Sequence, residues 1–173
     1  MGYFKGVNFL LRSGFLRCMT ILAHEHIKAV LEHGLVRLEN HGVIGPFSVD
    51  VCLGDELIRP DGEKVRIPED GLVIAPRDSY FWEFPSDLFL SEGLLAEVRT
   101  RSSYARLGLE TSGDASNDDL QLRQLEDRYF RPVCSLRTFG TYVRIRPGET
   151  IGQLVLRTDL ERSSTNDLKA LLE

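Results

Sequence analysis

The sequence contains few cysteines, and none of them is paired at the spacing of a metal-binding or redox motif. Its 173 residues hold Cys18, Cys52 and Cys134, which are odd in number and far apart, and no C-x-x-C segment occurs. This pattern argues against both a disulfide framework and a thiolate metal site. We therefore expect a protein of a reducing compartment and predict a cytoplasmic location.

An excess of positive charge and a long apolar run are also absent. The chain has 21 Lys and Arg against 26 Asp and Glu, a formal net charge of -5. General nucleic-acid binders and anionic-membrane binders need clustered positive charge, and a membrane-spanning helix needs about 20 consecutive apolar residues. We therefore expect neither nucleic acid nor membrane as a partner, and any bound phosphate should be small and local.

The composition does provide apolar residues for one core. With 42% apolar residues, a chain of this length suits a single globular domain. Residues 1–18 stand apart as an N-terminal extension without an assigned function, because Arg12 and Arg17 interrupt their apolar stretch and Met19 directly precedes the first helix signal. Residues 159–173 form a C-terminal tail, whose end predicts a short helix from Asn166 to Leu172.

The first regular element is predicted to be a helix over residues 21–33. Thr20 can cap it, and Gly34 provides the stop. Apolar residues recur inside it at helical spacing, at Ala23, Ile27, Val30 and Leu31. His24 and His26 are two positions apart and point to different faces, so they do not share a metal.

From residue 43 onward, short apolar runs bounded by Gly, Pro and Asp predict strands. These runs are Val49 to Leu53, Val65 to Ile67, Leu72 to Ala75, Leu94 to Thr100, Val133 to Leu136, Tyr142 to Ile145 and Ile151 to Leu156. The polar segment Thr111 to Asp119 is predicted to be an exposed loop. Many short strands after one early helix predict a mainly β fold, a β-barrel or β-sandwich of short strands with an N-terminal helix.

Residues 101–109, Arg-Ser-Ser-Tyr-Ala-Arg-Leu-Gly-Leu, combine two cations and two hydroxyls directly after a predicted strand. Arg101 can form a bidentate contact with phosphate, and Ser102 and Ser103 add hydroxyl and backbone donors. Such a segment suits a polyanion. The other interpretation is an arginine-rich surface turn whose charged face is solvated.

This segment resembles the nucleotide-binding motif of dCTP deaminases and, more loosely, the second motif of trimeric dUTPases. Two outer segments are similar to further motifs of that superfamily: Ser48 to Gly54 to its early strand motif, and Gly148 to Leu154 to its late strand motif. The resemblance spans residues 19–158 and implies a dUTPase-like domain there. It also implies a homotrimer with sites between subunits, and a deoxypyrimidine triphosphate, dCTP or dUTP, as the ligand.

Carried onto this sequence, the resemblance implies separate roles for the motif residues. Arg101, Ser102 and Ser103 would contact the triphosphate. Arg106 would lie beside the reacting base, and an arginine at that position favours the deaminase branch. Gln153 would hold a phosphate oxygen, the alternative being a polar residue at a strand end without a ligand.

The family motif that packs on the deoxyribose best matches Leu125 to Tyr129, where Glu126 stands in place of an aspartate. A second register would use Asp119. In either register a carboxylate and an aromatic ring such as that of Tyr129 would bind the sugar and exclude a ribose 2'-hydroxyl. Alternatively, Glu126 and Asp127 are exposed loop charges.

Deamination without zinc needs a carboxylate that activates water and carries its proton to the leaving ammonia. In the family that glutamate lies in the strand after the sugar motif, whereas Val133 to Thr138 contains no acid. Depending on the gap, Cys134, Leu136 or Arg137 takes its place. The zinc alternative is also missing, since no H-x-E precedes a P-C-x-x-C. We therefore predict no zinc and no metal held by the protein alone.

Three functions remain open. The first is a hydrolase that deaminates dCTP to dUTP and ammonia for dUMP biosynthesis, with Ser102, Arg106 and Glu126 as catalytic residues. The second is a dUTP pyrophosphatase that releases dUMP and pyrophosphate, using Glu126 or Asp127 with Mg²⁺ bound through the triphosphate. The third is a catalytically silent relative that binds dCTP or dUTP. The missing glutamate favours it, as does a C-terminal tail that lacks the Gly- or Gln-containing pattern of the family.

Overall fold

The computed structural model describes residues 19–38, 42–84, 87–114, 128–130, 132–159 and 166–172. Strands make up 48% of the structure and helices 14%, so the predicted mainly β fold is confirmed. In chain order the elements are β1 (Met19–Ile21), α1 (His24–Glu32), β2 (Val36–Leu38), β3 (Val49–Cys52), β4 (Glu56–Ile58), β5 (Lys64–Arg66), β6 (Leu72–Ile74), β7 (Ser79–Glu83), β8 (Leu88–Leu90), β9 (Leu94–Thr100), α2 (Ser102–Ala105), β10 (Leu109–Asp114), β11 (Arg128–Phe130), β12 (Val133–Thr138), β13 (Val143–Ile145), β14 (Thr150–Asp159) and α4 (Asn166–Leu172).

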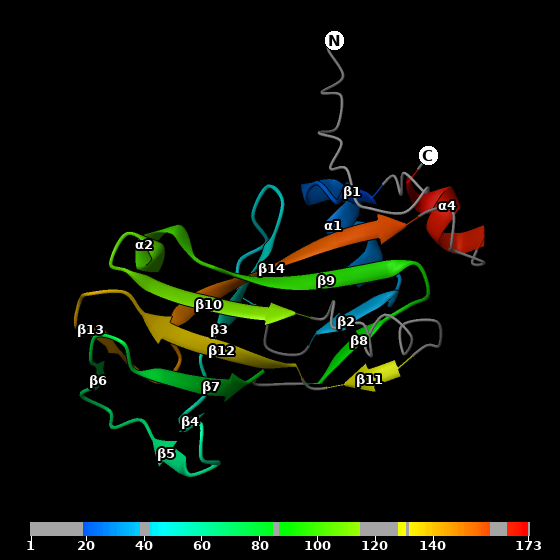
Figure 1. Cartoon of the computed structure of the whole chain (residues 1–173). Helices are drawn as coiled ribbons and strands as arrows, with labels where there is room; N and C mark the ends of the chain where they lie inside the picture. The colour runs from blue at the N-terminus through cyan, green and yellow to red at the C-terminus, as the bar shows by residue number, and fades with distance from the viewer. Residues whose placement is uncertain are drawn as a thin grey trace, which may run out of the picture.

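The strands form one large antiparallel sheet and two small ones (Figure 1). The large sheet has the order β1-β14-β9-β10-β12-β7-β4-β5, and β3 also pairs with β14. The smaller sheets are β11-β8-β2 and β13-β6. Strand β14 pairs with β1, β3 and β9 along its length. Segments that are far apart in the sequence therefore meet at this strand.

Burial alternates along strands such as β9 and β12 and gives the large sheet a core face. In β9, Leu94 and Val98 are buried whereas Arg99 is exposed, as the two-residue period of a strand requires. The ring of Trp82 is fully buried and stacks on Phe84 with centroids 5.6 Å apart. The opposite face carries polar side chains such as Arg99, together with the exposed apolar side chains of Phe81 and Val133.

Helix α1 begins three residues later than the sequence predicted, and the predicted cap is wrong. Its N-cap is Ala23, which makes no side-chain capping bond. Thr20 lies instead in β1, opposite Thr158 of β14, and this pairing keeps Thr20 extended before the helix starts. The helix ends at Glu32, and Gly34 follows with a φ of +69°, the left-handed conformation that favours glycine at a helix stop.

The predicted exposed loop from Thr111 to Asp119 is wrong at its start, because β10 runs to Asp114. Thr111 is only 1% exposed. Its hydroxyl accepts a hydrogen bond of 2.8 Å from Trp82 Nε1 and donates one of 2.9 Å to the Ser135 carbonyl. A polar side chain is tolerated in a core when it is hydrogen-bonded in this way. The rest of the segment lies outside the described residues.

The predicted C-terminal helix is present as α4, and it packs against α1. Its Leu168 is fully buried in the core. Within the described ranges, the helices are all too short or too polar to cross a membrane.

Candidate functional site

Two residues that the sequence assigned to phosphate, Arg101 and Gln153, come together where three strands meet. Strand β14 lies between β3 and β9, and Gln153 is opposite both Asp50 of β3 and Arg99 of β9. Arg101 directly follows β9, and its amide donates to the Ile151 carbonyl over 2.9 Å. The pairing of the sheet therefore brings two distant motifs into one cluster.

Asp50 joins the two donors. Its Oδ2 lies 3.3 Å from Nη2 of Arg101, and its Oδ1 accepts a hydrogen bond of 3.3 Å from the side-chain amide of Gln153. The Asp50 side chain is 11% exposed, whereas that of Arg101 is 41% exposed. The carboxylate thus contacts both donors from the buried side, and Arg101 remains accessible to an anion from solvent.

Asp50 was not predicted as a site residue. It lies in the segment Ser48 to Gly54 that carried part of the resemblance, but an aspartate within a strand does not indicate its partners. The structure also explains the glycine beside it. The Gly42 amide donates to the Asp50 carbonyl over 2.9 Å, and a Cβ at Gly42 would lie 2.9 Å from the Cβ of Asp50. A larger residue at that position would displace Asp50.

Helix α2 presents Ser102 and Ser103 to solvent, and the exposed Arg106 directly follows it. Arg101 is extended, with φ -62° and ψ 138°, and its carbonyl accepts a hydrogen bond of 3.0 Å from the Tyr104 amide. All three predicted residues beyond Arg101 are exposed. The predicted nucleotide-binding residues of this motif are therefore accessible, and Ser102 and Ser103 directly follow Arg101 of the Asp50 cluster.

Tyr104 fastens α2 to the turn before β14. Its hydroxyl donates to Oε2 of Glu149 over 2.5 Å, and the same oxygen accepts a bond of 2.9 Å from the Arg146 amide. Burial and the bond to Glu149 raise the pKa of Tyr104 to about 12. Burial alone would raise the pKa of Glu149, but hydrogen bonds from Tyr104 and Arg146 outweigh it and lower that pKa.

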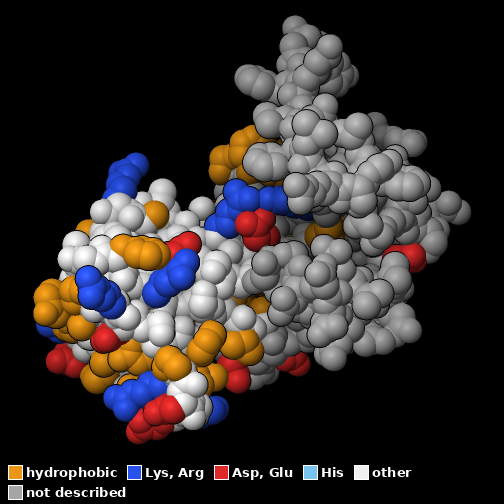
Figure 2. All heavy atoms as spheres, viewed as in Figure 1, with side chains coloured by type: hydrophobic (Ala, Val, Ile, Leu, Met, Phe, Trp, Pro, Cys, Tyr) orange, Lys and Arg blue, Asp and Glu red, His pale blue; other side chains and the backbone are white. Residues whose placement is uncertain are grey.

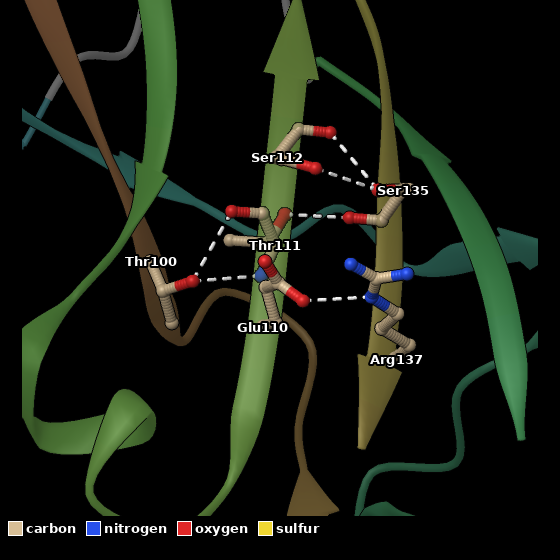
Figure 3. Close-up of polar contacts among 6 residues, drawn as sticks. All are labelled: Thr100, Glu110, Thr111, Ser112, Ser135 and Arg137. Carbon is tan, nitrogen blue, oxygen red and sulfur yellow. Dashed lines mark hydrogen bonds and ion pairs between the residues drawn. The ribbon is translucent and has the colours of Figure 1, made fainter. Parts of the chain in front are cut away.

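A second polar cluster lies on the exposed face of β10 and β12 (Figure 3). Oε2 of Glu110 accepts a hydrogen bond of 2.7 Å from Nε of Arg137, and the hydroxyls of Ser112 and Ser135 are 2.9 Å apart. The bond to Glu110 raises the pKa of Arg137. Figure 2 shows acidic and basic side chains lying side by side on this face of the protein.

Thr100 ties β9 to β10 between the two clusters. Its hydroxyl accepts a hydrogen bond of 2.7 Å from the Thr111 amide and donates one of 3.1 Å to the Thr111 carbonyl. The Thr100 hydroxyl is thus hydrogen-bonded to both the amide and the carbonyl of Thr111. Arg101 begins directly after this tie, so the start of the motif is anchored to the neighbouring strand.

The predicted sugar site falls largely outside the described residues. Glu126 lies there, as do the alternatives Asp119 and Asp127. Tyr129 is in β11, opposite Phe89 of β8. The roles of Glu126 and Tyr129 stay predictions.

No group of three or more His, Cys, Asp or Glu side chains in the described ranges is arranged to hold a metal ion. The carboxylates of the two clusters described above are paired with arginines, Asp50 with Arg101 and Glu110 with Arg137. Binding of Mg²⁺ through a triphosphate stays a prediction.

These elements define a mainly β protein with a candidate anion site at strand ends. A family model described as dCTP deaminase-like matches residues 21–158. The match covers most of the chain, which therefore belongs to the dCTP deaminase-like family. Membership in this family supports a role in deoxynucleotide metabolism.

A search of curated proteins found no match. Among solved structures, the chain is similar to the crystal structure of 2'-deoxycytidine 5'-triphosphate deaminase from Agrobacterium tumefaciens, with a TM-score of 0.59 and 18% sequence identity. The similarity covers 82% of this chain and 49% of that one. The chain thus spans about half the length of the solved protein, and at this identity the likeness shows the fold alone.

Proposed function

We propose that the chain binds a deoxypyrimidine triphosphate and converts dCTP to dUTP and ammonia. The observation that carries this proposal is the meeting of Arg101 and Gln153 at the Asp50 carboxylate. The two donors come from separate segments to which the resemblance assigns phosphate, and their convergence supports that assignment. Membership in the dCTP deaminase-like family favours dCTP as the substrate.

In this proposal Arg101 and Gln153 bind phosphate oxygens, and Ser102 and Ser103 add donors from the exposed side of α2. Guanidinium–phosphate contacts are charge-assisted and among the strongest hydrogen bonds in proteins. Arg106, one position past α2, would contact the base. Ser102 and Arg106 are then the residues of this turn that act in the reaction.

Glu126 and Tyr129 would bind the deoxyribose, and the active assembly would be a homotrimer with sites between subunits. Mg²⁺ would arrive with the triphosphate and neutralise part of its charge. Both oxygens of Asp50 are already engaged by Arg101 and Gln153. This arrangement fits a cation held by phosphate oxygens and water better than one held in a protein cage.

A catalytically silent nucleotide-binding protein is the second candidate, and β12 favours it. No residue of this strand is acidic, and its exposed Arg137 is bound to Glu110. If no carboxylate lies beside the cytosine base to activate water, the protein would bind the nucleotide without reacting with it. The dUTP pyrophosphatase alternative depends on Glu126 or Asp127. The experiment below distinguishes it from the other two functions.

The test is to incubate the purified protein with dCTP and with dUTP, with and without Mg²⁺, and to follow ammonia, dUMP and pyrophosphate. Ammonia from dCTP supports the deaminase, and pyrophosphate from dUTP supports the pyrophosphatase. Tight binding without product supports the silent relative. Absence of binding to either nucleotide, or unchanged binding after Arg101→Ala, would overturn the site assignment.

A further inference from the structure

Strand β12 directs only one of three candidate residues toward solvent. Cys134, Leu136 and Arg137 are the residues that stand at the position of the missing glutamate, depending on the gap. Cys134 and Leu136 are both 0% exposed and point into the core, whereas the Arg137 side chain is 52% exposed. The only one of these positions that can face a ligand therefore carries a cation. A carboxylate for this face has to come from another strand.

Glu110 of β10 is the cross-strand partner of Arg137. The Arg137 guanidinium binds its carboxylate over 2.7 Å, and the Glu110 side chain is 39% exposed. Directly paired residues of neighbouring strands point to the same face with their Cβ atoms about 5 Å apart. The Glu110 carboxylate therefore lies beside Arg137, which occupies the position of the missing glutamate, and it is held by that arginine and accessible to water.

Glu110 also lies on the same face of the sheet as Asp50 and Gln153 of the candidate anion site. The register pairs Asp50 with Gln153 and Gln153 with Arg99. It also pairs Arg99 with Ser112, which is two residues from Glu110 on the same side of β10. Because side chains alternate along a strand, all these residues share one face.

The separation suits one nucleotide lying across the sheet. Gln153 on β14 and Glu110 on β10 are two strands apart, a lateral distance of about 10 Å. The Thr100–Thr111 tie holds β9 and β10 together between them. A nucleotide with its phosphates at Gln153 would bring its base near Glu110 if it lay across β9 toward β10.

We propose that Glu110 is the residue that activates water for deamination, and that Arg137 is its positioning residue. This inference rests on the proposed deaminase function. Glu110 takes a proton from water as the water oxygen bonds to C4 of cytosine, and passes it to the exocyclic nitrogen. The C4–N bond then breaks and ammonia leaves. The second water proton ends on N3 of the uracil ring, and Glu110 returns to the carboxylate form.

The test compares Glu110→Gln, Glu110→Asp and Glu110→Ala with the matched control Glu97→Gln. Glu97 lies on β9 and is also bound by arginines, Arg99 and Arg157. Ammonia release from dCTP gives kcat, and calorimetry gives the dissociation constant of dCTP. We expect Glu110→Gln to lower kcat by about 100-fold or more, with dCTP affinity changed by less than about threefold. Glu97→Gln should keep kcat near the wild-type value.

Two further readouts separate catalysis from structure. Formate should restore part of the ammonia release of Glu110→Ala, which a purely structural role would not allow. If Glu110→Gln fails to fold, Glu110→Asp keeps the charge, retracts it by one methylene and should still lower kcat. A kcat within about threefold of wild type in the variants that fold overturns the role of Glu110 and leaves the proposed function standing. Wild-type protein that binds dCTP without releasing ammonia overturns both.

Discussion

The carboxylate of Asp50 lies 3.3 Å from the guanidinium of Arg101, so the arginine assigned to phosphate already holds an anion that belongs to the protein. Gln153, the other assigned donor, is bound to the second oxygen of the same carboxylate. An incoming phosphate would therefore approach Arg101 and Gln153 against the negative charge of Asp50.

Asp50→Asn should tighten the binding of tripolyphosphate in buffer without divalent cations. Two unit charges about 6 Å apart repel by about 3 kcal/mol at an effective dielectric of about 20. Solvent around Arg101 weakens this effect, and we expect a gain in affinity of about tenfold by calorimetry. Asp61→Asn is the control, because Asp61 accepts only a turn hydrogen bond from the Glu63 amide on an exposed hairpin. Weaker binding by Asp50→Asn would mean that Asp50 orients the donors rather than competing with the ligand.

Arg101→Ala should weaken the binding of dCTP by about 10- to 100-fold, the effect of losing a charge-assisted hydrogen bond. Arg59→Ala is the matched control, since Arg59 is also paired with a glutamate, Glu63, but lies on the β4–β5 hairpin. Calorimetry with both variants checks this, with thermal unfolding as a test of folding. Equal losses of affinity in the two variants would show a general charge effect and contradict a local site.

Tyr104→Phe should destabilise the protein by about 1 to 2 kcal/mol, because it removes a hydrogen bond to the ionised Glu149. The pKa of Glu149 is lower in the folded protein than its ordinary value of 4.5. This shift stabilises the fold above pH 4.5, and the stabilisation is lost as the pH falls through the pKa of the folded state. The raised pKa of Tyr104 acts in the opposite range: its stabilisation is complete below pH 10.0 and is lost as pH rises toward about 12. Wild type should therefore lose its advantage over Tyr104→Phe at both extremes.

Denaturant unfolding at several pH values measures this difference. The control is Tyr142→Phe, because Tyr142 is 73% exposed and its substitution should change stability little. A difference between wild type and Tyr104→Phe that is constant from acid to alkaline pH would contradict the coupling between Tyr104 and Glu149.

The strand pattern could be predicted because it depends on residues close together in the sequence. A short apolar run predicted a strand over Leu94 to Thr100, and β9 has the same bounds. The position of Thr20 could not be predicted, because its pairing with Thr158 depends on a strand more than a hundred residues away. The pairing of Thr20 with Thr158 outweighs the local preference of threonine for a helix N-cap.

The two carboxylates of the candidate site were missed for the same reason. Asp50 meets Arg101 only through the pairing of β14 with β3 and β9. Glu110 faces Arg137 only through the register of β10 and β12. A search for an acid along one strand does not find an acid supplied by its neighbour.

Thr111→Val should be among the more destabilising substitutions outside the apolar core. Valine has nearly the shape of threonine, so the change leaves little cavity, but it removes the acceptor of the buried Trp82 Nε1–H group and the donor to the Ser135 carbonyl. A buried polar group left without a partner costs about 1 to 3 kcal/mol, which lowers the unfolding midpoint by roughly 2 to 12 °C in a chain of this size. Trp82 is the single tryptophan, so its fluorescence follows the transition directly.

Thr20→Val is the control, because Thr20 is exposed on β1 and should leave the midpoint nearly unchanged. An unchanged midpoint in Thr111→Val would mean that the indole finds another partner and that the Thr111 hydroxyl does not hold β7, β10 and β12 together.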